Sequence, residues 1–265
     1  MGGTFKLLKH HTAMRHWYDR FRAAGIHLGI SLVIASLAAA LVFSVWYPSP
    51  YGQLSGGREL FMILVAVDVI LGPLITFSIF NRAKPVRELR RDLAVVALIQ
   101  LSALGYGLWT VAVARPVHLV FEIDRFRVVH AIDVPEELLN RTPHDIDALP
   151  LTGPTLLAVR QFRDSREESD ATLTALQGIA LGARPDLWQT YAASRAVVLK
   201  AAHPVTQLKT RFAARAGEID VVLREAGRQA ETTAYLPLVG RKTFWTAFID
   251  PVTAKVVAFL PLDSF

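Results

Sequence analysis

Apolar and polar residues are distributed unevenly along the chain. Three long apolar runs occupy residues 23–46, 60–80 and 93–114, with lengths of 24, 21 and 22 residues. An α-helix rises 1.5 Å per residue, so each run is long enough to cross a hydrocarbon core of about 30 Å. The first run is about twice as long as the apolar part of a signal peptide, and two more runs follow it. The pattern therefore predicts a domain of three transmembrane helices over residues 23–114.

The pattern changes to that of a water-soluble domain after residue 114. Val, Phe and Ile with partial alternation over residues 118–133 indicate one strand, or two short strands that meet near Asp124 and Arg125. Residues 134–165 are punctuated by proline and predict loops with one short element. Two helical and three strand-like segments follow, at residues 185–202, 204–226, 233–239, 243–250 and 255–260. This order predicts a small α+β domain with an antiparallel sheet over residues 115–265.

The charged residues indicate how the helices cross the membrane. The chain holds 29 Lys and Arg against 23 Asp and Glu, and five of the basic residues lie in residues 1–22 and five in residues 81–92. The loop between the first two runs has Arg58 alone, and residues 115–265 hold 18 residues of each sign. Short loops rich in Lys and Arg remain in the cytoplasm. We therefore expect residues 1–22 to be cytoplasmic and residues 115–265 to lie on the opposite side. The balanced charge of that domain gives no sign of nucleic-acid binding.

Patterns typical of catalysis and metal binding are missing from the sequence. The chain has no cysteine, which excludes disulfides, thiolate metal sites and cysteine nucleophiles. The motifs GxSxG, HExxH, GxGxxG and the P-loop do not occur. His144 with Asp145 and Asp147 could hold a cation, but such a group is more often a solvated loop. We expect no enzymatic activity, no cofactor and no metal site.

Asp68 is the only acidic residue inside an apolar run. A carboxylate that faces lipid costs at least a few kcal/mol, so Asp68 should face other helices, water or a partner, or else stay protonated. Three interpretations remain open: an interhelical hydrogen bond, a contact with a partner's transmembrane helix, and proton or ion transport. Judged by depth, the polar residues expected near it are Ser36 and either Ser102 or Tyr106, while Ser31 lies more than a turn nearer the cytoplasm and is a poorer candidate. His27 lies about 12 Å away in depth, too far for a direct ion pair.

Other candidate contact residues are glycine, proline and one charged pair. Gly72 and Pro73 follow Asp68 by about one turn and should loosen the helix. Gly25 and Gly29 form a small-xxx-small pair that would let another helix approach the first run. Asp124 and Arg125 interrupt an apolar stretch, so we expect either a binding site or a buried ion pair.

Aromatic residues flank the apolar runs. Trp and Tyr favour the boundary between membrane and water, so these residues are expected to be interface anchors. The loop over residues 47–57 is rich in Pro, Gly and Ser and predicts an ordered turn that ends at a helix start near Arg58. The expected anchors are Trp17, Tyr18, Trp46, Tyr47, Tyr51 and Trp109.

Four stretches combine polar residues with an apolar context in a distinctive way. They are HWYDRFRAAGIHLGISL at 16–32, YPSPYGQLSGGREL at 47–60, DVILGPLITFSIF at 68–80 and RPVHLVFEIDRFRVV at 115–129. In these stretches the chain resembles the TfpX/TfpZ-type type IV pilin accessory proteins of Gram-negative bacteria. The resemblance implies an inner-membrane protein whose C-terminal domain is periplasmic.

The resemblance also implies a function. Such a protein would act like a chaperone that binds its cognate major type IV pilin in the lipid bilayer and promotes or modulates pilus assembly, with other pilus assembly proteins as further partners. We expect Asp68, Gly72 and Pro73 to line the contact inside the membrane and the domain after Arg115 to contact the head of the pilin. Two alternatives are a membrane-anchored periplasmic sensor or ligand-binding protein, and a small transporter or enzyme subunit.

Overall fold

The computed structural model describes the chain path from residue 3 to residue 265 and the side chains from Trp17 onward. The chain divides into two compact units. One, called the membrane unit below, consists of Met1–Ser44 and Arg58–Ala112. The other, called the sheet unit, consists of Val45–Gly57 and Val113–Phe265. The connection between the first two apolar runs is therefore part of the sheet unit.

The membrane unit is built from helices. Within the described residues, three segments are long and apolar enough to cross a membrane: Trp17–Trp46, Gly57–Ile79 and Val86–Val113. The predicted fold class, three apolar helices followed by a domain with a mostly antiparallel sheet, is confirmed. The helical elements in order are α1 (Gly3–Leu41), a π-helical turn (Val42–Trp46), α3 (Gly57–Ala66), a second π-helical turn (Val67–Leu71), α4 (Gly72–Ile79) and α5 (Val86–Val113).

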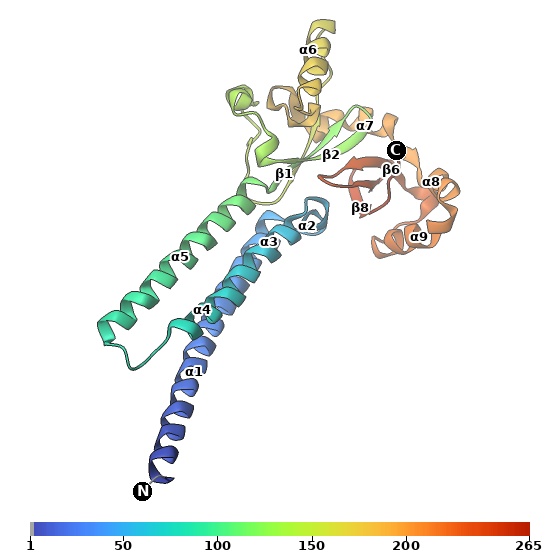
Figure 1. Cartoon of the computed structure of the whole chain (residues 1–265). Coiled ribbons are helices and arrows are strands. Elements are labelled where there is room, and N and C mark those ends of the chain that lie inside the picture. The colour runs from blue at the N-terminus through green and yellow to red at the C-terminus, as the bar shows by residue number, and fades with distance from the viewer. Residues whose placement is uncertain (1–2) are drawn as a thin grey trace. The chain divides into compact units, whose positions relative to one another are not determined.

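The helices of the membrane unit pack unevenly. α1 and α4 lie against each other, and Arg20 Nε donates a hydrogen bond of 3.0 Å to the carbonyl of Phe80 at the end of α4. A salt bridge of 3.3 Å joins Arg82 to Asp19 near the same end. By contrast, α5 runs apart from this pair (Figure 1). A cavity lined by side chains of α1, α4 and α5 lies in this unit and is described below.

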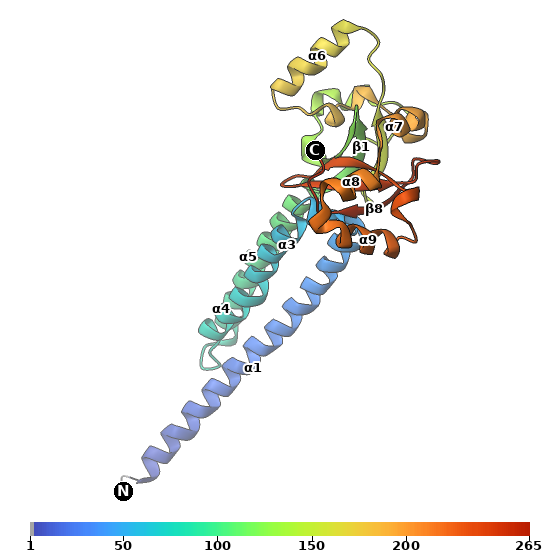
Figure 2. The same ribbon diagram turned by 90° about the vertical axis from the view of Figure 1, so that its right-hand side faces the viewer.

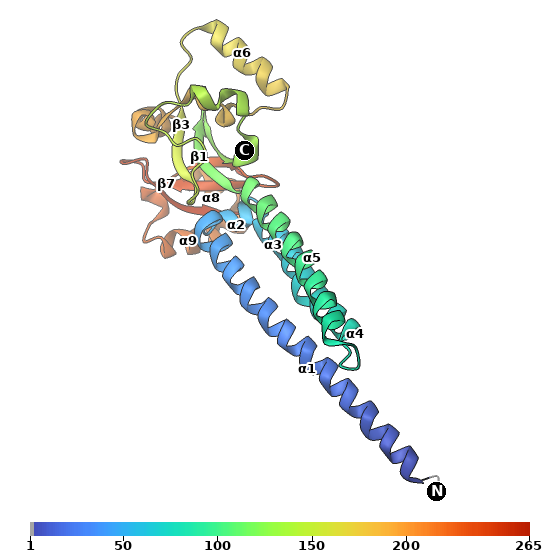
Figure 3. The ribbon, with the colours of Figure 1, turned by 90° about the vertical axis from the view of Figure 1, so that its left-hand side faces the viewer.

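The sheet unit contains one mixed sheet. Over the described residues its strand order is β4-β3-β1-β2-β6-β7-β8, with β5 paired to β6. Most neighbouring strands are antiparallel, but β1 with β3 and β2 with β6 are parallel. Figure 3 shows β3 beside β1. The strands are β1 (Pro116–Glu122), β2 (Arg125–His130), β3 (Thr155–Val159), β4 (Trp188–Thr190), β5 (His203–Pro204), β6 (Ala234–Val239), β7 (Phe244–Ile249) and β8 (Val256–Leu260).

Short helices complete the sheet unit. Figure 2 shows α8 and α9 near β8, where they bury Leu208, Ile219 and Leu223 with Tyr235 and Phe248 of the sheet. The main apolar cluster of the sheet unit contains Phe121 on β1, Phe126 on β2 and Leu236 on β6. The helices are α2 (Tyr51–Leu54), α6 (Ser165–Leu176), α7 (Arg195–Ala201), α8 (Val205–Arg211) and α9 (Ala216–Glu225).

The strand predictions agree well with the structure. The segment over residues 118–133 forms two strands joined by a turn at Ile123 and Asp124, as one of the two interpretations held. The three closing strands also occupy the predicted places as the antiparallel series β6, β7 and β8. Strands β1, β6 and β7 are buried along nearly their whole length, and short runs rich in β-branched and aromatic residues between turn residues can be recognised locally.

The helix predictions are partly wrong. Residues 185–194 form no α-helix, because Trp188–Thr190 pairs with β3 as strand β4 between two short 3-10 helices, Pro185–Leu187 and Tyr191–Ser194. The buried indole N–H of Trp188 also donates a 2.7 Å hydrogen bond to the carbonyl of Gly182. The helix expected over 204–226 is interrupted at Phe212, where φ is −116° and ψ is 52°. The break yields two helices that both pack on the sheet. The spacing of apolar residues along the sequence does not reveal such a break, because it depends on packing against the rest of the domain.

Two expected interface anchors lie in the core of the sheet unit instead. Tyr47 is only 1% exposed, and its ring lies against Gly57. The ring of Tyr51 is 6.0 Å from that of Phe259 on β8. Leu54, also 1% exposed, belongs to the main apolar cluster of the domain. The predicted ordered turn therefore contributes to the folded domain, and the helix that follows it starts at Gly57, close to the predicted Arg58.

Candidate functional site

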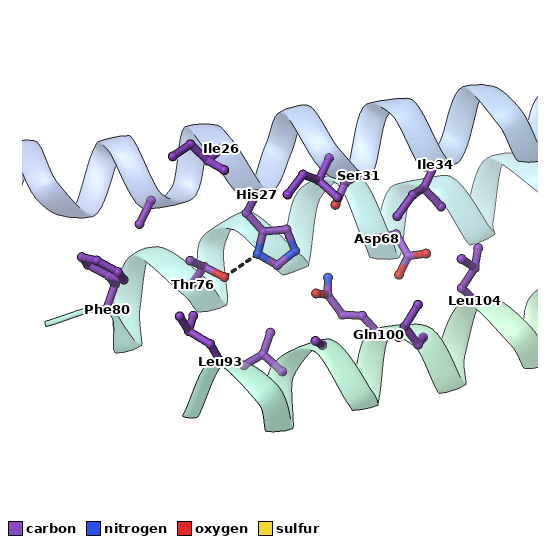
Figure 4. Close-up of a pocket in the computed structure, with 15 residues that line it drawn as sticks. Ile26, His27, Ser31, Ile34, Asp68, Thr76, Phe80, Leu93, Gln100 and Leu104 are labelled. Carbon is purple, nitrogen blue, oxygen red and sulfur yellow. Dashed lines mark hydrogen bonds between the residues drawn. The ribbon is translucent and has the colours of Figure 1, made fainter. Parts of the chain in front are cut away.

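A cavity of about 510 Å³ lies inside the membrane unit. Its walls come from α1, from the π-helical turn with α4, and from α5 (Figure 4). Most of the lining is apolar, but five polar side chains face the same space. The apolar members include Ile26, Ile30, Ile34, Leu101 and Leu104, and the polar members are His27, Ser31, Asp68, Thr76 and Gln100.

Asp68 is the charged group of this cavity. Its side chain is 9% exposed, and its Oδ1 is buried without a hydrogen-bond partner among the described residues. The residue lies in the π-helical turn Val67–Leu71, immediately before Gly72 and Pro73 at the start of α4. A π turn places more residues in one turn than an α turn and so changes the direction of its side chains. The irregularity expected from the Gly-Pro pair is therefore present, and it contains the carboxylate.

Gln100 approaches the same region from α5. A Cβ atom on Gly72 would come within 3.0 Å of the Gln100 side chain, so the absent side chain of Gly72 leaves room for the amide. Figure 4 shows Gln100 and Asp68 reaching into one space from opposite walls. No hydrogen bond joins these two side chains in the described part of the chain. Gly72 therefore contributes to the cavity by leaving room for the Gln100 side chain.

His27 and Thr76 form a separate pair in the cavity. His27 Nδ1 lies 2.5 Å from Thr76 Oγ1, a hydrogen bond between α1 and α4. This contact agrees with the expectation that His27 does not pair directly with Asp68, since the described residues contain no ion pair between them. The pair holds α1 and α4 together, and the other ring nitrogen of His27, Nε2, would lie 3.1 Å from a Cβ atom on Gly72, beside the Gln100 amide.

The polar residues that were expected beside Asp68 do not line the cavity. Ser36 is exposed and donates to the carbonyl of Leu32, while Tyr106 is 70% exposed. Ser102 is exposed as well. Ser31, which is one to two turns from Ser36, lines the cavity instead. The reason is that depth alone does not decide which face of a helix a residue occupies.

The other predicted contact residues are dispersed. A Cβ atom on Gly25 or Gly29 would meet nothing within 4 Å, so no other helix of this chain packs on that face at these positions. Asp124 and Arg125 lie in the sheet unit, at the turn between β1 and β2. They form an ion pair of 2.7 Å, but their side chains are 54% and 37% exposed, so the expectation of a buried pair was wrong. Asp124 lies in the two-residue turn, and Arg125, the first residue of β2, lies over the ring of Phe265.

Two polar residues that line the cavity with Asp68 were not expected there: Gln100 was not considered, and Ser31 was judged a poorer candidate because it lies nearer the cytoplasm. Gln100 lies in the third apolar run, and a search for charged residues does not find it because its side chain is uncharged. A search for any amide within an apolar run would have found it, because an amide in hydrocarbon also needs partners. The face on which Ser31 lies depends on how α1 packs against α4, and that information is tertiary.

The geometry favours binding of a polar group within an apolar setting. A buried carboxylate oxygen without a partner accepts a hydrogen bond from any donor that reaches it. Across the described residues there is no group of three or more His, Asp or Glu arranged to hold a metal ion. The site therefore suits recognition of a hydrogen-bond donor that enters from the membrane.

Comparison with known proteins identifies similar sequences over nearly the whole chain. The fimbrial assembly protein of serogroup I from Dichelobacter nodosus is 33% identical over 246 residues, which cover 92% of this chain and 95% of that relative. The fimbrial assembly protein of serogroup E1 from the same organism is 32% identical over 246 residues, with the same coverage of 92% and 95%.

Two further comparisons refine this result. The fimbrial assembly protein of serogroups C1 and C2 from Dichelobacter nodosus is 41% identical over 122 residues, or 46% of this chain and 91% of that relative. The family described as fimbrial assembly protein FimB matches residues 15–56. The matched segment includes the polar cavity residues His27 and Ser31 and most of the connection that packs in the sheet unit. No solved structure matches the chain.

Proposed function

The chain belongs to the family of fimbrial assembly proteins, and from this membership we propose that it is a TfpX/TfpZ-type accessory factor that binds its cognate type IV pilin. Its place in pilus assembly and its three apolar helices make it a membrane-anchored protein of a pilus system. In the proposal the membrane is the bacterial inner membrane, the N-terminus is cytoplasmic and the sheet unit is periplasmic. The distribution of Lys and Arg supports this orientation.

One observation supports the binding of a client most directly. The cavity of the membrane unit presents a buried Asp68 oxygen that has no partner among the described residues. An acidic side chain inside a membrane protein is expected to have a functional partner. A pilin that waits in the membrane before assembly offers an apolar helix and a periplasmic head. The protein would hold the helix at Asp68, Gly72 and Pro73 and the head through the sheet unit.

The first test is recovery of the pilin with the protein. Tagged chain is purified in mild detergent from cells that express the cognate type IV pilin, after photo-crosslinking from position 125 at the start of β2. A pilin adduct at position 125 and co-purified pilin are the expected result. A correctly inserted, folded chain that yields neither would contradict the proposal. A deletion strain should at the same time show altered surface pili.

A second candidate function rests on a different cavity. The sheet unit contains a hollow of about 920 Å³ lined by residues that include Arg127, His130, Asp133 and Arg241. His130 is 1% exposed, and its Nε2 has no hydrogen-bond partner within the described chain. Such a hollow is what a periplasmic sensor or ligand-binding protein would need. Loss of a small-molecule response in His130→Gln, with piliation unchanged, would favour this alternative.

A further inference from the structure

We propose that the cavity between the α1–α4 pair and α5 receives one apolar transmembrane helix of the client, and that this helix presents a hydrogen-bond donor to Asp68 and Gln100. The inference rests on the proposed function and specifies the chemistry of its membrane contact. The donor is an ammonium, hydroxyl or amide group on an otherwise apolar helix. Gln100 is assigned here as a residue that determines which client helix fits.

The cavity is accessible from the surrounding lipid. Three of its apolar lining residues are also largely exposed: Ile26 is 57%, Ile30 55% and Leu101 60% exposed. They stand on α1 and α5, the two helices that face each other across the space. A closed core pocket would bury such side chains. A helix that diffuses in the bilayer could therefore enter between α1 and α5 without unfolding the membrane unit.

The lining of the cavity is extended along the direction of the helices. Its lining runs along α1 from Ala23 to Ile34 and along α5 from Leu93 to Leu104. At 1.5 Å per residue, each wall is about 16 Å long. That length corresponds to about three turns of a helix lying parallel to the walls. Helices in membranes associate through close packing together with a few interhelical hydrogen bonds, and this groove offers both.

The polar groups of the groove define what the helix must bring. Asp68 Oδ1 is a buried acceptor without a donor, and Gln100 adds an amide that both donates and accepts. The apolar runs 23–46, 60–80 and 93–114 contain no Lys or Arg, so a second copy of this chain could bring hydroxyl and amide donors but no fixed cation from them. The strongest complement of a lone buried carboxylate is a fixed cation, which a different protein would have to carry. This charge relationship favours a client helix over self-association.

The stability of Asp68 variants separates this inference from a structural role. If Asp68 held the helices of this chain together, replacing it would loosen them. Because its Oδ1 has no partner in the described chain, Asp68→Leu should instead fold and insert at least as well as the native chain. Only contact with the client should weaken. Asp68→Asn, which keeps one acceptor and the side-chain volume, should have a smaller effect.

Photo-crosslinking in native membranes tests the location. The crosslinking residue is placed at 30 and at 101, which line the groove, and at 98 as the control, because Leu98 is 67% exposed on α5 but does not line the cavity. Positions 30 and 101 should yield pilin adducts, and position 98 mainly lipid adducts. If 30 and 101 yield only lipid or a second copy while 125 still yields pilin, the groove inference is overturned and the proposed function stands. If no position yields pilin, the proposed function itself fails.

A double-mutant cycle tests the chemistry. Asp68→Leu and Gln100→Leu should each lower the yield of pilin adducts from position 101 by about 3- to 30-fold, the range expected for one hydrogen bond within a membrane. The polar residues of the pilin's transmembrane segment are then replaced one at a time. One of these pilin replacements should lower the adduct yield of the native chain as much as Asp68→Leu does. Combined with Asp68→Leu, the same replacement should lower the yield no further. Additive losses for every replacement would overturn the assignment of a donor to Asp68.

Discussion

The backbone N–H of Arg241 donates a hydrogen bond of 3.1 Å to the carbonyl oxygen of Leu54. Leu54 ends α2, in the connection between the first two apolar helices, whereas Arg241 lies between β6 and β7. A second bond of 2.7 Å runs from the N–H of Gly153 to the carbonyl of Val45. The connection over residues 45–57 is thus fixed to the sheet unit at both of its ends. The sheet unit therefore combines residues from two places in the sequence. Most of it follows the third apolar helix, but residues 45–57 come before the second.

Leu54→Ala should destabilise the sheet unit although residue 54 lies in a connecting loop. The side chain is 1% exposed within the main apolar cluster, and removing a buried Leu side chain typically costs about 2–5 kcal/mol. Denaturant unfolding of the detergent-solubilised chain, followed by tryptophan fluorescence, measures the loss. Gln53→Ala, at an exposed neighbouring position, is the control and should change stability by less than about 0.5 kcal/mol. Equal stability of both variants would show that the connection is not part of the core.

Gly72→Ala should impair client binding without lowering the amount of protein. The new methyl group would occupy the place of the Gln100 amide, which must rotate out of the groove. Alanine also favours a helix over glycine by about 1 kcal/mol, so folding should not suffer. Piliation and pilin adducts from position 101 measure the effect. Gly105→Ala, where an added Cβ meets nothing within 4 Å, should behave like the native chain.

A compensating change makes this test sharper. Asn is one methylene shorter than Gln, so Gly72→Ala combined with Gln100→Asn restores space and keeps the amide. The double variant should recover part of the piliation lost in Gly72→Ala. No recovery, together with unchanged folding, would mean that Gly72 acts in some way other than by making room for Gln100.

The stability of the sheet unit should fall as the pH is lowered from about 6.5 to 4. Burial lowers the pKa of His118 to about 4, although a hydrogen bond to the carbonyl of Ala148 acts in the opposite direction. Below pH 6.5 the unfolded chain binds a proton at this residue that the folded chain does not bind, so acid favours unfolding until the folded pKa is reached. A difference of about 2.5 pH units corresponds to a loss on the order of 3 kcal/mol.

The contribution of His118 can be isolated by substitution. His118 lies 3.0 Å from the Ala148 carbonyl through Nε2 and 2.6 Å from the Thr155 hydroxyl through Nδ1. Gln can donate to one and accept from the other but does not titrate, so His118→Gln should flatten the stability profile between pH 4 and 6.5. His144→Gln, at an exposed position, should leave the profile unchanged. An unaltered slope in His118→Gln would assign the pH dependence to other groups.

Removal of the Asp124–Arg125 pair should affect partner binding more than folding. The pair is largely exposed, and exposed ion pairs contribute about 0–1 kcal/mol to stability. The variant with both residues changed to Ala should therefore unfold at nearly the same denaturant concentration as the native chain. If the β1–β2 turn contacts the pilin head as proposed, piliation should fall. Normal piliation in this variant would remove the turn from the contact surface.

Asp68→Asn should reduce piliation less than Asp68→Leu, with equal amounts of both proteins in the membrane. Asn keeps an oxygen acceptor but loses the charge, and a hydrogen bond to a charged group is stronger than a neutral one. The surface pilin of complemented strains, normalised to the level of each variant, provides the measurement. Equal piliation in the native and both variant strains would exclude Asp68 from the mechanism.

The features that depend on local pattern were predictable from the sequence. The three apolar helices, the strands near Phe121 and Phe126, the closing strands β6 to β8 and the helix start near Arg58 all follow from periodicity, length and turn residues. Asp68 could be selected because a carboxylate in hydrocarbon is costly wherever the surrounding helices lie. Each of these inferences uses information contained within a short stretch of chain.

The remaining features required the tertiary structure, because they depend on which distant segments meet. Trp188 is in a strand rather than a helix because β3 is available for pairing, and Tyr47 is buried because the connection folds into the sheet unit. Gln100 reaches the Asp68 region because Gly72 leaves space, and Ser31 replaces Ser36 in the cavity because of how α1 is rotated against α4. Sequence determined which groups need partners. Packing decided which partners they meet, since helix rotation and strand pairing are set by contacts over the whole domain.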